Sequence, residues 1–89
     1  MRYVMIRTYS AGVHFGRLVR RDGKEVVLRD ARRVWYWKGA RTLNELVAHG
    51  PAEGSKISEP TSRITLTEAI EVIEMTPEQH AKLAGATWA

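Results

Sequence analysis

Cationic and aromatic side chains alternate through the first half of the chain, in a pattern suited to binding a flat, negatively charged molecule. Guanidinium groups make planar, bidentate contacts with phosphate, and aromatic rings stack on nucleobases at about 1–3 kcal/mol per base. Nine arginines fall within residues 1–41 and are interleaved with Tyr3, Tyr9, Phe15, Trp35, Tyr36 and Trp37. The densest part runs from Arg32 to Lys38, so it holds the first candidates for ligand contacts.

The same residues also fit a purely structural role. Trp and Tyr at strand spacing are more often part of a core, and strand arginines often form a solvated face. For Trp35 and Trp37 the sequence favours a core or subunit interface. For Tyr36 and the arginines around it, a structural role and a binding role are equally supported.

Catalytic and metal-binding patterns are weak by comparison. The three histidines, His14, His49 and His80, lie in separate segments, and the chain has no cysteine. Their spacing does not suggest a metal site, and no glycine-rich phosphate loop is present. Glutamates at 68, 71 and 74 would form a solvated face on a helix. We therefore expect a protein that is not an enzyme and that uses no metal or cofactor.

Length and charge set further bounds. The 89 residues predict a single domain over 1–89, with a modest core that oligomerisation would extend. Residues 1–41 hold eleven Lys/Arg and three Asp/Glu, whereas residues 42–89 hold three and seven, giving net charges of +8 and −4. Such asymmetry predicts one basic and one acidic surface. With no membrane-length apolar run and no signal-peptide layout, we expect a soluble cytoplasmic protein.

The first elements are expected to be strands. Residues 2–9 are rich in β-branched and aromatic types and predict a strand. Gly12 then separates this segment from a second strand over residues 13–21. Gly16 inside that strand indicates a bulge or the close approach of another backbone or a ligand.

A hairpin follows. Asp22-Gly23 between two strand-like runs predicts a two-residue turn into a third strand over about residues 24–29. Asp30-Ala31 marks a short break before a fourth strand over residues 32–37. On that strand, side chains alternate between a face with Arg33, Trp35 and Trp37 and a face with Arg32, Val34 and Tyr36.

The next segment predicts a short helix and then a loop. Thr42 and Glu45 have capping-box spacing, and Gly50-Pro51 ends the helix. Its apolar stripe consists of Leu43, Leu46 and Val47. Residues 51–62 are polar, with two prolines and a glycine, and predict a surface loop.

The C-terminal part is more ambiguous. Residues 64–75 predict two short strands around Thr67–Ala69, or one bent strand, and a helix over 67–75 is an alternative. Thr76-Pro77 opens a helix to about Leu83, which Gly85 ends. Together these elements predict an α+β fold: a mainly antiparallel, twisted sheet or small barrel of five or six strands, with one or two short helices.

The sequence also resembles a family of small proteins of unknown function found in tailed-phage genomes and prophages. The segments that carry the resemblance are RTYSAGV, DGKEVVL, RRVWYWKGA, TLNEL and LTEAIE, spread over nearly the whole chain. The resemblance implies a phage protein working in the cytoplasm of an infected bacterial host. Compact phage proteins of this kind include anti-defence sponges, which bind a cyclic nucleotide or cyclic ADP-ribose immune signal between protomers.

Under that interpretation the aromatic and cationic residues acquire specific roles. Tyr9, Trp35, Tyr36 or Trp37 would stack on a base, and the backbone at Ser10-Ala11-Gly12 could approach the ligand closely. Phosphate would be neutralised by Arg7, Arg17, Arg32, Arg33 or Lys38.

Three functions therefore remain open, in this order. The first is a homo-oligomeric binder of a small anionic, nucleotide-like ligand. The second is nucleic-acid binding. The third is an inhibitor that blocks a host protein, or a structural phage component, either of which would expose an apolar patch.

Overall fold

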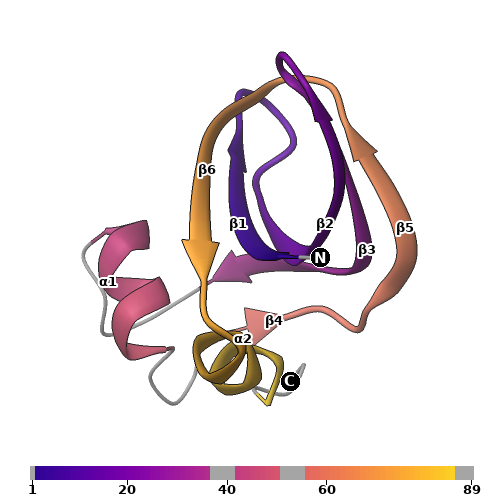
Figure 1. Cartoon of the computed structure of the whole chain (residues 1–89). Helices are drawn as coiled ribbons and strands as arrows, with labels where there is room; N and C mark the ends of the chain where they lie inside the picture. The colour runs from indigo at the N-terminus through magenta and orange to yellow at the C-terminus, as the bar shows by residue number, and fades with distance from the viewer. Residues whose placement is uncertain (1, 37–41, 51–55, 86–89) are drawn as a thin grey trace.

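The computed structural model describes residues 2–36, 42–50 and 56–85, with backbone alone at Trp35 and Tyr36. Within these ranges the chain forms six strands and two helices (Figure 1). In chain order they are β1 (Arg2–Thr8), β2 (Val13–Asp22), β3 (Glu25–Tyr36), α1 (Leu43–His49), β4 (Lys56–Ile57), β5 (Thr61–Leu66), β6 (Ala69–Met75) and α2 (Pro77–Ala84).

All six strands join one antiparallel sheet. Five of them follow the order β4-β3-β2-β1-β6, in which β4 pairs with the second half of β3, and β5 pairs with the first half of β3. The predicted α+β class is confirmed, and the sheet is open rather than a closed barrel. Figure 1 shows β1, β2 and β3 curling so that β5 and β6 stand on opposite sides of the curl. Both helices lie at one end of the sheet.

The hairpin between β2 and β3 forms where it was expected, with its turn shifted by one residue. Asp22 pairs with Glu25, so the two loop residues are Gly23 and Lys24. Gly23 has φ 60°, a positive value at the first loop position that glycine adopts without strain.

The predicted third and fourth strands are in fact one strand. The expected break at Asp30-Ala31 is a bulge within β3, where Asp30 adopts φ 51° and β3 has one residue more than β2 opposite Gly16. A Cβ on Gly16 would lie 2.8 Å from the Arg29 carbonyl oxygen and 3.1 Å from the Ala31 Cα. Both the bulge and the close backbone approach predicted at Gly16 are therefore present.

The predicted loop over residues 51–62 is partly wrong. Residues 51–55 lie outside the described ranges, but Lys56 and Ile57 form β4 against β3, and β5 already begins at Thr61. Because the residues around Ile57 are polar, no sequence pattern indicated a strand there, although the Ile57 side chain is fully buried. The helix alternative over 67–75 is also wrong, because Ala69–Met75 pairs along β1 as β6.

Both helices begin and end as predicted. The Thr42 hydroxyl accepts from the Glu45 N–H at the start of α1, and Gly50 caps its end. At α2, Thr76 and Gln79 form a reciprocal capping box, and Pro77 occupies the first turn. These caps satisfy N–H groups that a helix terminus leaves without partners.

The sheet buries a separate apolar cluster on each face. One face packs Met5, Phe15 and Val34 against Leu46 of α1 and Leu83 of α2. The concave face encloses a second cluster from β1, β3 and β5, namely Val4, Ile6, Val26, Leu28, Ala31 and Leu66. Because both faces are covered, consecutive residues of a strand can be buried together, as Val4, Met5 and Ile6 are.

We expect Gly16→Ala to lower the free energy of unfolding by about 1–3 kcal/mol, because the new methyl group meets backbone atoms that cannot rotate away. Urea unfolding measures this loss. Ser62→Ala, at an exposed site on β5, is the control and should change stability by less than ~0.5 kcal/mol. Equal stability of the two variants would contradict the tight packing at Gly16.

Candidate anion-binding site

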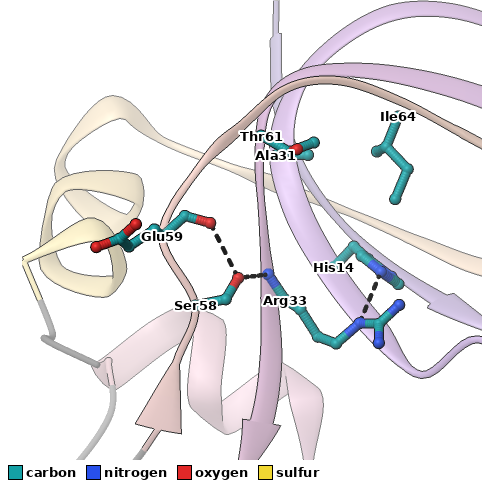
Figure 2. Close-up of a pocket in the computed structure, with 7 residues that line it drawn as sticks. All are labelled: His14, Ala31, Arg33, Ser58, Glu59, Thr61 and Ile64. Carbon is teal, nitrogen blue, oxygen red and sulfur yellow. Dashed lines mark hydrogen bonds between the residues drawn. The ribbon is translucent and has the colours of Figure 1, made fainter. Parts of the chain in front are cut away.

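A cavity of about 450 Å³ opens beside the concave face, where β2, β3 and the β4–β5 connection meet (Figure 2). It is lined by His14, Ala31, Arg33, Ser58, Glu59, Thr61 and Ile64. Of these seven residues, sequence analysis had proposed only Arg33 as a ligand contact. The cavity therefore brings Arg33 and its neighbour Ala31 on β3 together with five residues from other segments of the chain.

Strand register places His14 and Arg33 together. They are direct cross-strand partners on β2 and β3, and Ile6 of β1 is the next residue across the sheet. Alternation along β3 then sends Arg33 to the cavity side and Arg32 to the helix side, opposite Phe15. The predicted assignment of Arg32 and Arg33 to opposite faces thus holds, and only Arg33 reaches the cavity.

Ser58 fixes the wall of the cavity to β3. Its N–H donates to the Arg33 carbonyl at 2.9 Å, and its Oγ accepts from the Arg33 N–H at 2.8 Å. The Ser58 hydroxyl also donates to the Glu59 carbonyl at 3.1 Å. Ser58 therefore holds both the N–H and the carbonyl of Arg33, which limits the positions that the Arg33 side chain can reach.

His14 orients the Arg33 side chain. Arg33 Nε donates to His14 Nε2 at 3.2 Å, so Nε2 carries a lone pair and the ring proton resides on Nδ1. Burial, and then the neighbouring guanidinium, lower the pKa of His14 from 6.5 to about 4, so the ring is neutral near pH 7. The two terminal nitrogens of Arg33 have no protein acceptor within the described residues.

His14 itself is an unusual core residue. Its side chain is buried, and Nδ1 has no hydrogen-bond partner among the described residues. A buried donor without a partner costs about 1–3 kcal/mol. Such groups are uncommon in folded proteins and often mark functional positions.

The local charge favours an anion. Glu59 contributes to the cavity rim, but its carboxylate points away from His14 and Arg33 (Figure 2). The guanidinium of Arg33 is therefore the charged group that faces the cavity. Ala31 and Ile64 supply apolar wall, while Ser58 and Thr61 supply hydroxyl groups.

Arg17 and Arg32, both predicted ligand contacts, lie on the other face of the sheet. Arg17 Nη2 forms an ion pair with Asp30 at 2.6 Å, and Arg32 Nη1 donates to the Ser58 carbonyl at 3.4 Å. Both are close enough to His80 of α2 to affect it. Burial lowers the pKa of His80, with Arg32 and then Arg17 adding to the effect and Asp30 opposing it.

The remaining described candidates do not line the cavity. Arg7, Tyr9 and Ser10 are exposed at the end of β1, and Tyr9 is 76% exposed. The Thr8 hydroxyl closes the turn that follows, donating to the Gly12 carbonyl at 2.8 Å and accepting from the Ala11 N–H at 2.9 Å. Trp37, Lys38 and the side chains of Trp35 and Tyr36 lie outside the described residues.

The signals for the missed residues were weak. In the sequence, His14 was considered only as a possible metal ligand, and its burial between Val13 and Phe15 became evident from the structure, where both faces of β2 are covered. Ser58, Glu59 and Thr61 fall in a polar stretch with no distinguishing pattern. Only the pairing of β3 with β4 and β5 brings them to Arg33.

Residues 1–83 match a family described as "Domain of unknown function (DUF6948)", and the chain belongs to this family. Comparison with curated proteins and with solved structures gave no match. In the described ranges, no helix has the length and apolar character needed to cross a membrane. The same residues contain no group of three or more His, Asp or Glu side chains arranged to hold a metal ion.

We expect stability to fall as the solution is acidified through the titration range of His14. Its pKa is about 4 in the folded state and about 6.5 in the unfolded chain, so the unfolded state binds more protons between these values. The free energy of unfolding should therefore be unaffected by His14 above about pH 6.5. It should drop by on the order of 3 kcal/mol as the pH falls to about 4.

Urea unfolding across this range, compared with His14→Gln, measures the effect. Glutamine keeps an acceptor for Arg33 but does not titrate, so the variant should lose less stability on acidification. His80 is present in both proteins, and its lowered pKa also reduces stability on acidification. Because this loss is common to both proteins, the difference between their pH profiles reports on His14. Parallel pH profiles for the two proteins would contradict the assignment.

Proposed function

We propose that the protein is a non-enzymatic binding protein that sequesters a small anionic, nucleotide-like ligand, with Arg33 as the main anion contact. The observation that carries this proposal is the His14–Arg33 pair. One nitrogen of the guanidinium is engaged by a neutral, buried histidine, and the terminal nitrogens remain for a ligand. An orientation fixed in advance reduces the entropy lost on binding.

The size and lining of the cavity support a compact ligand. About 450 Å³ lies within the range of roughly 300–1,000 Å³ typical of small-molecule sites. Apolar wall from Ala31 and Ile64 suits a ring, and the hydroxyls of Ser58 and Thr61 suit sugar or phosphate oxygens. One free guanidinium can pair with one phosphate group in a bidentate manner.

Binding is favoured over catalysis by the state of His14. A general base needs an accessible lone pair and a pKa near the working pH. The Nε2 lone pair of His14 already accepts from Arg33, and its pKa is about 4. The ring is therefore suited to holding Arg33 in place rather than to moving a proton.

Nucleic-acid binding is the second candidate, and intramolecular pairing weakens it. Arg17 is paired with Asp30 at 2.6 Å and Arg20 with Glu25 at 2.8 Å, and Arg2 is paired with Glu74. These pairs reduce the positive charge available to a long polyanion. A host-protein blocker is the third candidate, for which exposed apolar side chains such as Tyr9 and Ile70 offer a surface.

The resemblance to phage and prophage proteins supplies a biological setting for the proposal. In that setting the protein acts in the cytoplasm of an infected bacterium as an anti-defence factor. Its ligand would be a cyclic nucleotide or a cyclic ADP-ribose isomer that activates a host immune effector. Tight binding without turnover would lower the free concentration of that signal.

A thermal-shift screen tests the proposal, using cyclic di- and trinucleotides, cyclic ADP-ribose isomers and short oligonucleotides. A ligand at 100 times its dissociation constant should stabilise the protein by ~2.7 kcal/mol. Arg33→Gln should weaken binding by about 10-fold or more, because a hydrogen bond to a charged group contributes roughly 1.5–3 kcal/mol.

Arg63→Gln is the matched control, since Arg63 is exposed on β5 and does not line the cavity. It should bind as the unaltered protein does. Equal affinities for Arg33→Gln and Arg63→Gln would place the ligand elsewhere. Binding of oligonucleotides alone, with affinity falling steeply as salt rises, would instead favour the nucleic-acid function.

A further inference from the structure

Strand β6 has a free edge. It pairs with β1 along Ala69–Met75, and no second strand pairs with it among the described residues. Figure 1 shows β6 at one side of the curl, with β5 at the other. Unpaired backbone N–H and C=O groups along such an edge are a template for another strand.

The upper end of β6 carries exposed apolar surface. Ile70 is 55% exposed and is the extra residue where the β1–β6 register shifts, because Arg7 pairs with Glu71 and Thr8 with Ala69. Tyr9 is 76% exposed, and its N–H donates at 3.0 Å to the carbonyl of Glu68, the residue before β6. Ile70 and Tyr9 are two of the three large apolar side chains exposed among the described residues.

The acidic residues of β6 are balanced by arginines of the neighbouring strand. Glu74 forms an ion pair with Arg2, and Glu71 lies opposite Arg7 in the β1–β6 ladder. Opposite charges on adjacent strands attract one another. The edge therefore carries little net charge and can approach an identical edge without strong repulsion.

We propose that two copies of this chain pair through their β6 edges in an antiparallel, two-fold symmetric dimer. The Ala69 N–H donates to the Lys24 carbonyl at 3.0 Å, so the available edge begins at Ile70. Val72 is the midpoint of β6, and centring the symmetry axis there pairs Ile70–Glu74 of the two copies. Glu71 then faces the partner's Ile73, and Glu74 faces the partner's Ile70. No glutamate opposes a glutamate, whereas an axis at Glu71 would place two like charges directly opposite each other.

The dimer is expected to be of moderate affinity. A ladder over Ile70–Glu74 buries less than the ~1,600 Å² of a standard interface, even with the side chains of Ile70 and Tyr9. Light scattering or sedimentation over micromolar concentrations should show a monomer–dimer equilibrium. Ile70→Lys should shift it toward monomer by at least 10-fold in dissociation constant.

Val19→Lys is the matched control, because Val19 is the third exposed large apolar residue and lies in β2, away from β6. It should leave the equilibrium unchanged. Circular dichroism establishes that both variants remain folded. A monomer at every concentration, or a dimer weakened equally by both substitutions, would overturn the proposal.

The register is tested by cross-linking, which is simple in a chain without cysteine. Residues on the two-fold axis lie about 4.5–5.5 Å apart, within the Cα separation that a disulfide spans. Val72→Cys should therefore form a covalent dimer under mild oxidation much faster than Val19→Cys. Equal rates for the two variants would overturn the β6 pairing, whatever ligand binds at Arg33.

Discussion

The close approach of β2 and β3 at Gly16 is the constraint on which the rest of the structure depends. The missing Cβ lets the bulged backbone of Arg29–Ala31 cross next to Gly16. Bulges bend a strand and increase its twist. A second register shift follows between Leu18 and Arg20, so the β2–β3 pair bends at two points. The curl allows β5 to enclose the concave cluster and brings the β4–β5 connection to the cavity.

The adjacent residues Arg32 and Arg33 have different surroundings, because side chains alternate between the two faces of the sheet along β3. Arg32 faces α2, where the His80 ring stacks on Tyr3 with centroids 3.9 Å apart. Arg33 faces the cavity and is oriented by His14. Ser58 contacts both, through its carbonyl to the Arg32 guanidinium and through its backbone and hydroxyl to the Arg33 backbone. A single residue of the β4–β5 connection therefore joins the two sides of the sheet.

Much of the local structure was predictable because its causes are local. The Thr42 and Thr76 caps, the hairpin near Gly23 and the irregularity at Gly16 each depend on residues close in sequence. The alternation that separates Arg32 from Arg33 follows from strand geometry alone.

The errors came from contacts between distant segments. β4 exists because Ile57 pairs with Val34, and a two-residue strand in a polar segment has no periodicity to detect. The continuity of β3 depends on β2 pairing along both of its halves. The site was predicted least well, because Ser58, Thr61 and Ile64 reach Arg33 only through tertiary structure.

The pairing of β1 with β6 has a consequence for synthesis of the chain on the ribosome. Tyr3 pairs with Met75 across this ladder, so β1 leaves the exit tunnel well before the strand that pairs with it. Loops of this length close slowly, and proteins dominated by distant strand pairs fold slowly. Until β6 emerges, one edge of the apolar strand β1 is unpaired and can pair with a strand of another nascent chain. The N-terminal arginines, which repel one another between chains, would protect the nascent chain during that delay.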